Sequence, residues 1–172
     1  PAARAQLGPS AHVDTFTRDH LPPPDQWPDL LLDLPEFQYP DHVNAAVELT
    51  DRMVEKGFGD HIALIGNGRR RTYKELADWS NRLAHALVED FGLKPGNRVL
   101  IRSGNNPAFV AAWLAVTKAG GVAVNTMPLL RAGELAKVVD KAEIALALSD
   151  SRIMDDLVAC AKESRFLKKV AA

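Results

Sequence analysis

The chain has 172 residues, of which 47% are hydrophobic and 25% are charged, and these are the proportions of an ordinary globular domain with its own core. A formal net charge of −1 gives no electrostatic basis for binding nucleic acid or an anionic membrane surface, and no apolar run approaches the roughly 20 residues that span a bilayer. The first residues lack the charged start and apolar centre of a signal peptide, and Cys160 is the only cysteine, so we expect a cytoplasmic protein without disulfides.

A proline-rich segment occupies residues 1–41. It holds eight of the eleven prolines, which excludes a regular helix or a central strand. The segment also carries apolar residues that a disordered linker does not need, namely Trp27, Leu30, Leu31, Leu32, Leu34, Phe37 and Tyr39. We therefore predict an extended arm that packs on a domain formed by residues 42–172.

Regular elements begin at residue 42. Apolar residues at helical spacing predict a helix over 43–54, and Gly57 follows as its stop. Two short runs at 62–65 and 69–72 are typical of strands. The intervening residues 66–68, Gly-Asn-Gly, favour a hairpin turn with positive φ over a nucleotide-binding loop.

Strands and helices then alternate along the chain. Thr72 and Glu75 have the spacing of a capping box, and an amphipathic helix is expected to run from there to Phe91. Further strands are expected at 99–101, 122–124 and 144–148, and further helices at 108–118, 135–142 and 153–161. Asn106 and Pro107 suit the N-cap and first position of the helix at 108–118. The alternation predicts an α/β fold: a partial doubly wound, largely parallel sheet with flanking helices and an early β-hairpin.

The last residues, 167–172, are typical of a strand that begins after a helix and a turn. A buried strand needs ladder partners for its backbone groups. We interpret the chain as an α/β subdomain that is truncated partway through its sheet. An exposed sheet edge or apolar face drives self-association, so we expect a homo-oligomer.

Short motifs that carry nucleotide or acyl-transfer chemistry are missing. The sequence contains no Gly-x-Gly-x-x-Gly after a strand, no Gly-x-x-x-x-Gly-Lys-Ser/Thr and no Gly-x-Ser-x-Gly. The five histidines are scattered, and Cys160 suits a core position. Arg69 to Arg71 are typical of a solvated hairpin edge. Asp155 and Asp156 are adjacent on a predicted helix, so their side chains point about 100° apart and cannot share a substrate. The residues alone therefore predict no catalytic side chain and no metal ligand.

One edge of the predicted sheet suits a ligand. In open parallel sheets, ligands bind in the crevice outside the carboxyl ends of the strands. Residues 102–106 and 125–130 follow two of these strands, and their loop N–H groups and asparagine amides can donate to a phosphate or a carbonyl. The alternative is that they are strand-to-helix turns in which Asn and Pro serve as caps.

Several spaced stretches carry a family resemblance. They are residues 71–76 with 81–84, 93–99 with 105–109, and 114–125 followed by 128–131. This set resembles the start of the AMP-forming acyl-CoA synthetase superfamily, which also holds luciferases and peptide-synthetase adenylation domains. The sequence around Asn105 and at 127–131, together with the proline-rich arm, is most similar to that of the benzoate- and 2-aminobenzoate-CoA ligases.

The resemblance implies a two-step reaction in the parent enzyme. A carboxylate attacks the α-phosphate of ATP-Mg to give an acyl-adenylate and pyrophosphate, and the CoA thiolate then displaces AMP. It implies an aromatic acid such as benzoate or 2-aminobenzoate as substrate, with ATP, Mg and CoA as cofactors that this chain does not hold tightly. Family members are much longer and carry their catalytic residues further on, so the chain alone is expected to be inactive.

The resemblance also assigns one loop of this chain to CoA. In some relatives the loop after the last matching stretch borders the CoA nucleotide, which implies a CoA-side position for Met127, Pro128, Leu129 and Arg131. Many relatives have Ser, Thr or Asn where Arg131 stands, so the start of the following helix is expected to differ. Two alternatives stay open: a stand-alone α/β module that binds a flavin or nicotinamide nucleotide, and an interaction domain whose arm and hairpin bind another protein.

Overall fold

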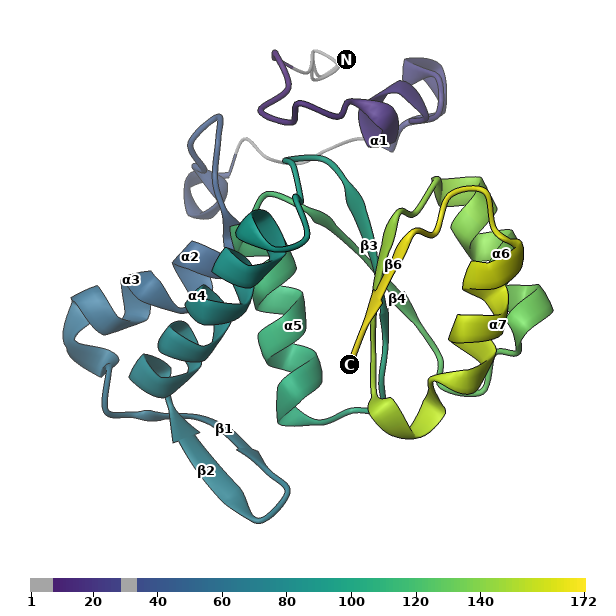
Figure 1. Cartoon of the computed structure of the whole chain (residues 1–172). Coiled ribbons are helices and arrows are strands. Elements are labelled where there is room, and N and C mark those ends of the chain that lie inside the picture. The colour runs from purple at the N-terminus through teal and green to yellow at the C-terminus, as the bar shows by residue number, and fades with distance from the viewer. Residues whose placement is uncertain (1–7, 29–33) are drawn as a thin grey trace.

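Four parallel strands form the central sheet of the computed structural model, which describes residues 8–28 and 34–172. The sheet order is β4-β3-β5-β6, with β3 at Arg98–Arg102, β4 at Val122–Thr126, β5 at Leu146–Ser149 and β6 at Lys169–Ala171. The connecting helices are α5 (Pro107–Lys118), α6 (Ala132–Ala142) and α7 (Asp155–Glu163). Figure 1 shows α5 on one face of the sheet and α6 and α7 on the other. The predicted doubly wound α/β fold is confirmed.

The early hairpin is formed by β1 (Ile62–Gly66) and β2 (Arg69–Thr72), which pair antiparallel outside the main sheet. Asn67 and Gly68 have φ values of 52° and 70°, as the two central residues of a tight hairpin turn require. Gly66 lies against the start of α5, because a Cβ built there would be 2.8 Å from Pro107 Cγ. The hairpin therefore projects from the lower end of the molecule in Figure 1, the end at which α5 begins.

Helix α4 (Tyr73–Glu89) begins at the predicted capping box. Thr72 N donates to the Glu75 carboxylate at 2.8 Å, and Glu75 N donates to Thr72 Oγ1 at 3.2 Å. The apolar stripe of α4 packs along α5, and Leu76 and Leu87 are buried there. The hairpin and α4 thus form a layer outside α5.

Helix α5 is apolar almost all round because it lies between α4 and the sheet. Its N-cap is Asn106, whose Oδ1 accepts from Phe109 N at 2.9 Å. Ala111, Ala115 and Val116 are fully buried, with contacts to neighbouring elements on opposite sides. The predicted sandwiched helix is confirmed.

Strand β3 is buried along its whole length and divides the core in two. Val99 and Ile101 join the cluster beneath α4 and α5, whereas Leu100 joins the cluster beneath α6 and α7. Cys160 belongs to the second cluster, and burial, followed by the nearby carboxylates, raises the pKa of its thiol. It is a core residue, as the sequence indicated.

The helix predicted over residues 43–54 is broken into three pieces. They are α2 (Ala45–Leu49), α3 (Asp51–Met53) and a π-helical turn, η3 (Val54–Phe58). The break is at Thr50, whose hydroxyl donates to the Ala46 carbonyl at 2.6 Å and competes with the helical hydrogen bonds. Gly57, the predicted stop, has a non-helical φ of 88° and lies inside η3, one residue before its end.

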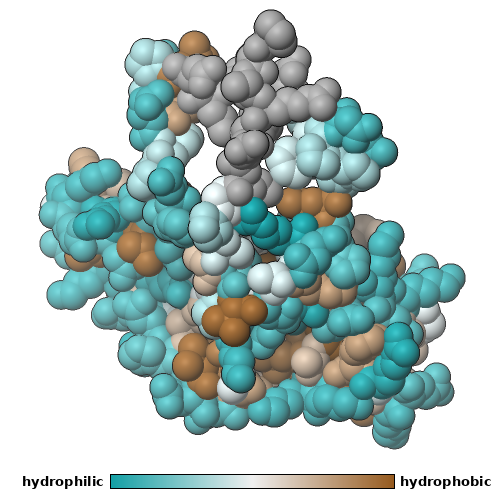
Figure 2. Space-filling model, turned by 90° about the horizontal axis from the view of Figure 1, so that it is seen from above, coloured by the Kyte–Doolittle hydropathy of each residue, from teal (hydrophilic) through white to brown (hydrophobic). Residues whose placement is uncertain are grey.

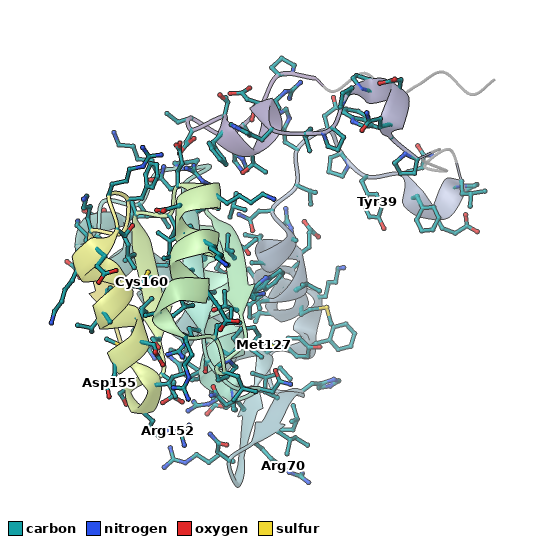
Figure 3. The ribbon with its side chains drawn as sticks, turned by 90° about the vertical axis from the view of Figure 1, so that its right-hand side faces the viewer. Tyr39, Arg70, Met127, Arg152, Asp155 and Cys160 are labelled. Carbon is teal, nitrogen blue, oxygen red and sulfur yellow. The ribbon has the colours of Figure 1, made fainter. Side chains whose placement is uncertain are left out.

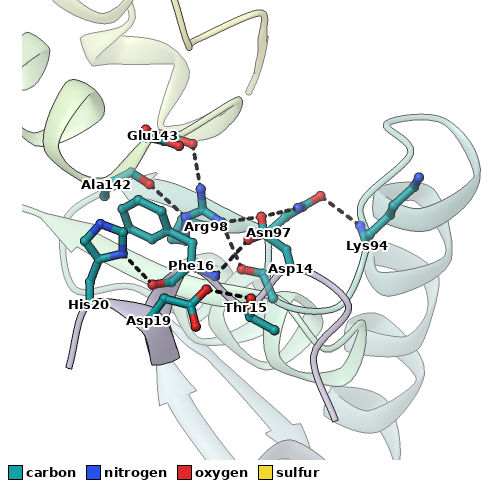
Figure 4. A network of polar contacts seen from close by, with 11 residues as sticks. Asp14, Thr15, Phe16, Asp19, His20, Lys94, Asn97, Arg98, Ala142 and Glu143 are labelled. Atoms are coloured by element: carbon teal, nitrogen blue, oxygen red, sulfur yellow. Dashed lines mark hydrogen bonds and ion pairs between the residues drawn. The ribbon is translucent and has the colours of Figure 1, made fainter. Parts of the chain in front are cut away.

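The N-terminal segment lies across the amino ends of the strands. It contains α1 (Phe16–Asp19) and the 3₁₀ turns η1 (Pro24–Gln26) and η2 (Pro35–Phe37). Figure 4 shows Asp14 and Phe16 gathered around Arg98 at the start of β3, and the Phe16 ring centroid is 4.3 Å from the guanidinium carbon. Asp14 N also donates to the Pro95 carbonyl at 3.0 Å. These contacts join the segment to the domain.

The apolar residues named for the arm differ in their burial. Trp27 is half-buried, whereas Leu34, Phe37 and Tyr39 are 49%, 40% and 65% exposed. Leu30 to Leu32 lie outside the described residues. Figure 2, which views this end of the molecule, shows hydrophobic residues in separate patches on a mainly hydrophilic face. The described part of the arm therefore contacts the domain chiefly around Asp14 and Phe16.

Candidate functional site

The carboxyl ends of β3, β4 and β5 meet at one edge of the sheet. Arg102 at the end of β3 is paired in register with Thr126 of β4 and with Ser149 of β5. The chain leaves β3 toward α5 on one face and leaves β5 toward α7 on the other, so connections diverge between these neighbouring strands. This divergence is the topological switch point at which α/β sheets bind ligands.

The two loops that the sequence placed at this edge lie on different cavities. Ser103 and Asn106 line a cavity on the α5 face. Pro128 and Leu129 line a second one, the carboxyl-edge cavity, on the α6 and α7 face. The remaining lining residues of the carboxyl-edge cavity are Arg102, Arg131, Arg152, Ile153, Asp155, Asp156 and Ala159. The structure therefore divides residues 102–106 between two cavities, with Arg102 in the same cavity as Pro128 and Leu129.

Of the four residues assigned to the CoA side, three line the carboxyl-edge cavity. These are Pro128, Leu129 and Arg131, and Leu129 is 82% exposed at the tip of its loop. Met127 is 63% exposed and does not line the cavity, although Figure 3 shows it at the same end of the molecule as Arg152 and Asp155. The loop thus presents apolar side chains beside charged ones.

Arg102 forms the floor of this cavity. It is 1% exposed, and its guanidinium donates to the carbonyls of Pro128 at 2.7 Å and Leu130 at 2.8 Å, and to that of Ile153. Its Nη2 is 3.6 Å from the Asp156 carboxylate. Among the described residues, its Nε has no hydrogen-bond partner. A buried cation of this kind is tolerated because carbonyl and carboxylate oxygens surround it.

Two further arginines, each 81% exposed, stand at the rim. Arg131 Nη1 is 3.2 Å from the Asp156 carboxylate. Arg152 donates from Nε and Nη2 to the two carboxylate oxygens of Asp150, at 2.9 Å and 2.6 Å. These hydrogen bonds lower the pKa of Asp150 to about 2, so this carboxylate is ionised at neutral pH. Each rim guanidinium keeps donors that its carboxylate partner does not use.

The N-cap of helix α6 is Arg131 and not a Ser, Thr or Asn residue. Arginine has no side-chain acceptor, so Arg131 cannot bind the first N–H groups of α6. Glu134 instead accepts from Arg131 N at 2.9 Å, and Asp156 of the next helix accepts from Ala132 N at 3.3 Å. Asp156 therefore caps α6 from outside and also pairs with two arginines.

The cavity carries three arginines against Asp155 and Asp156. Exposed guanidinium groups bind phosphate oxygens through charge-assisted, often bidentate, hydrogen bonds. Leu129 supplies apolar surface next to them. The arrangement suits an anionic ligand that also has a flat or apolar part, such as a nucleotide.

Arg152 was missed at the sequence level, yet a signal for it was present. Arg102, Arg131 and Arg152 follow or end three strands that the alternation predicted, and the carboxyl ends of parallel strands meet at one edge. A search for cations just after each strand finds all three. Only the structure, however, shows which of them is buried.

The other singled-out residues take structural positions. Arg71 stacks on Trp79, with its guanidinium carbon 4.4 Å from the ring centroid, and Figure 3 shows Arg70 on the projecting hairpin. Across residues 8–28 and 34–172, no three His, Cys, Asp or Glu side chains come together as a metal site. In the same ranges, no helix is both long and apolar enough to cross a membrane.

The cavity on the α5 face has a volume of about 540 Å³ and a mainly apolar wall. Helices α4 and α5 contribute Trp79, Leu83 and Phe109, the turn after α4 contributes Phe91, and the strands contribute Ile101 and Leu148. Ser149 and Asp150 also line it, and Asp150 accepts hydrogen bonds from Arg152 of the carboxyl-edge cavity. We call it the apolar cavity.

Comparison with known proteins gives consistent matches. The sequence profile of a family described as AMP-binding enzyme matches residues 51–171. A protein from Streptomyces sp named salicylyl-CoA synthase / salicylate adenylyltransferase is 35% identical over 98 residues, which cover 57% of this chain and 18% of the relative. A 3-oxocholest-4-en-26-oate–CoA ligase from Rhodococcus rhodochrous is 31% identical over 111 residues, which cover 64% of this chain and 20% of the relative.

A solved structure matches over more of the chain. The crystal structure of an anthranilate CoA ligase in complex with anthranoyl-AMP superposes with a TM-score of 0.73 over 81% of this chain and 27% of that chain, at 17% sequence identity. At this identity the likeness concerns the fold. The chain spans about a fifth of the length of the two curated relatives.

Proposed function

The chain belongs to the AMP-binding enzyme family, and from this premise we propose that it is the N-terminal part of an ATP-dependent carboxylate–CoA ligase that activates an aromatic acid such as benzoate or 2-aminobenzoate. The observation that carries the proposal is the family match over 51–171, which includes both the sheet and the carboxyl-edge cavity. Such an enzyme joins its acid to AMP with release of pyrophosphate and then transfers the acyl group to the CoA thiol. We place it in the cytoplasm, where ATP and CoA are supplied.

Two names among the relatives support an aromatic acid. The Streptomyces protein is named for salicylate, and the structural neighbour for anthranilate, and both compounds are benzoates with a polar group in the ortho position. The Rhodococcus protein is named for a steroid acid. The choice of acid is therefore the part of the proposal that most needs an experiment.

The role proposed for this chain is to bind the nucleotide end of CoA in the carboxyl-edge cavity. Adenosine 3′,5′-bisphosphate, which forms that end, combines phosphates with a flat base. Arg131 and Arg152 would donate to the phosphates, while Leu129 and Pro128 would contact the base. No catalytic step is assigned to these residues, since they bind and orient a substrate.

In the part of the chain that the structure describes, no three His, Cys, Asp or Glu side chains come together as a metal site, and the carboxylates of Asp150 and Asp156 are paired with arginines. We therefore assign the magnesium ion to other parts of the parent enzyme. We also propose that the 172-residue chain is inactive alone.

Two assays test the proposal. The full-length protein is expected to catalyse pyrophosphate exchange into ATP that depends on benzoate or 2-aminobenzoate, and to form the CoA thioester. The 172-residue chain is expected to release no pyrophosphate. Activity with steroid or fatty acids but not with aromatic acids would overturn the proposed substrate class. Pyrophosphate release by the 172-residue chain would overturn the proposal that it is inactive alone. Saturable binding of a flavin or nicotinamide nucleotide would favour a stand-alone module instead.

A further inference from the structure

Strand β3 carries a buried arginine at each end. Arg98 and Arg102 are 7% and 1% exposed, and both point to the α6 and α7 face, because side chains four positions apart on a strand lie on the same side. Burying a cation costs free energy unless hydrogen bonds replace its water. Both residues meet this cost with backbone carbonyls, but at opposite edges of the sheet.

Arg102 connects two loops that belong to different strands. Its Nη2 binds the carbonyls of Pro128 and Leu130 in the loop after β4, and its Nη1 binds the carbonyl of Ile153 in η4 (Ser151–Ile153), which follows β5. The planar guanidinium has donors in fixed directions, so it fixes the orientation of its partners as well as their distance. One side chain thus sets the separation of the two loops.

Each of these loops carries one exposed arginine beside the anchored carbonyls. Arg131 directly follows Leu130, and Arg152 directly precedes Ile153. Asp156 adds a second connection, because its carboxylate lies 3.6 Å from Arg102 and 3.2 Å from Arg131. Arg102, which is only 1% exposed, therefore holds the backbone next to each rim arginine.

We propose that Arg102 is a positioning residue: it holds the two loops so that Arg131 and Arg152 bind the same anionic ligand. This inference rests on the proposed function for the identity of the ligand, the nucleotide end of CoA. Arg102 sets the distance between the two loops, and Arg131 and Arg152 contact the phosphate groups.

The first test measures loop order without any ligand. Amide hydrogen exchange is compared between the wild-type chain and the Arg102→Met variant, which has a similar volume and leaves no buried charge unpaired. We expect exchange at 129–132 and 151–156 to rise by about tenfold or more, since the lost charge-assisted hydrogen bonds each contribute at least that factor. Amides of α4 and α5 should keep their protection.

The second test measures binding of adenosine 3′,5′-bisphosphate by calorimetry. Arg131→Ala and Arg152→Ala should weaken binding while leaving loop exchange unchanged. Arg102→Met should weaken binding by about tenfold and also increase amide exchange in the two loops. Arg102→Lys keeps the charge but loses the planar set of guanidinium donors. Compared with Arg102→Met, it should therefore recover only part of the affinity and part of the protection of the loop amides.

Arg98→Lys is the matched control. It makes the Arg-to-Lys change of Arg102→Lys on the same strand at the opposite edge, and it should leave both the binding and the exchange of 129–132 and 151–156 as in the wild type. Unchanged loop exchange in Arg102→Met, or a uniform rise across the whole chain, would overturn the positioning role. Absence of nucleotide binding by the wild type would overturn the CoA assignment, while the exchange comparison would still decide whether Arg102 orders the loops.

Discussion

Asp14 forms an ion pair with Arg98, which stands 84 positions further along the chain. The Arg98 guanidinium also donates to the carbonyls of Ala142 at 2.7 Å and Glu143 at 3.1 Å, so it joins the N-terminal segment, the start of β3 and the end of α6 (Figure 4). Asn97 adds a donor to the same Asp14 carboxylate at 2.9 Å. Asp14, which lies far from β3 in the sequence, thus covers the amino edge of the sheet.

The first prediction concerns acid stability. Burial acts to raise the pKa of Asp14, but hydrogen bonds from Phe16 N, Arg98 and Asn97 outweigh it and hold the pKa below its ordinary value of 3.8. A carboxyl group whose pKa is lowered by folding stabilises the fold above its unfolded pKa, and the contribution is lost as the pH falls through the folded pKa. Asp14→Asn should therefore cost about 1–3 kcal/mol of unfolding free energy at pH 7, and progressively less below pH about 4.

Urea unfolding of the wild type and Asp14→Asn at pH 7 and pH 3 checks this prediction. Asp25→Asn is the control, because Asp25 lies in the same segment, is exposed and makes no hydrogen bond or ion pair within residues 8–28 and 34–172. A difference between wild type and Asp14→Asn that stays constant with pH would contradict the assigned cause.

Gly96 should be intolerant of a side chain. Its φ is 91°, and a Cβ built there would be 2.0 Å from the Asp14 carbonyl oxygen. Gly96→Ala combines backbone strain of about 1–2 kcal/mol with displacement of the N-terminal segment. We expect proteolysis near residues 8–20 to become much faster, whereas Gly104→Ala should not change it, since nothing lies within 4 Å of a Cβ there. Equal cleavage of the two variants would show that the segment does not dock through this contact.

Local signals predicted the elements well because they depend on neighbouring residues. The Thr72–Glu75 capping box, the Asn67–Gly68 turn and the Asn106–Pro107 helix start were all visible in the sequence and are confirmed. The helix over 43–54 was wrong in its continuity, because the Thr50 hydroxyl competes for the Ala46 carbonyl and helical spacing does not reveal this.

The site was harder to predict because it depends on contacts between distant residues. The sheet edge singled out residues 102–106 and 125–130, and a family resemblance singled out 127–131, but neither showed that Arg102 forms the floor of the cavity and Arg152 its other rim. Whether an arginine at the end of a strand is buried or solvated depends on the loops that fold over it. No periodicity in the sequence encodes that.

Lys118 provides a further prediction about the fold. Its side chain is 6% exposed, and Nζ lies 2.6 Å from the Asp51 carboxylate and 2.7 Å from Asn81 Oδ1. Lys118→Met leaves Asp51 partly buried without its cation, which should cost about 2–4 kcal/mol in thermal or urea unfolding. Burial acts to raise the pKa of Asp51 and the Lys118 hydrogen bond lowers it, so this variant should also raise that pKa in an NMR titration.

The double variant Asp51→Asn with Lys118→Met distinguishes the energy of the Asp51–Lys118 interaction from the contributions of the two side chains to other contacts. Because neither residue is then charged, the double variant should be more stable than Lys118→Met alone. Additive losses would instead mean that the two side chains act independently, despite the short distance between them.

The last prediction is self-association of the chain. The apolar cavity opens between α4, α5 and the strands, and β6 is an edge strand with β5 as its neighbour. Apolar surface and unpaired strand edges both promote association, so light scattering at increasing concentration should show dimers or larger species. Ala108→Glu places a charge at the exposed rim of the cavity, near the N-terminus of α5 where a carboxylate is tolerated, and should shift the chain toward monomer. Ile65→Glu, on the hairpin where Ile65 is 72% exposed, is the control. A wild-type monomer at high concentration would contradict the prediction, and dissociation by Ile65→Glu alone would move the interface to the hairpin.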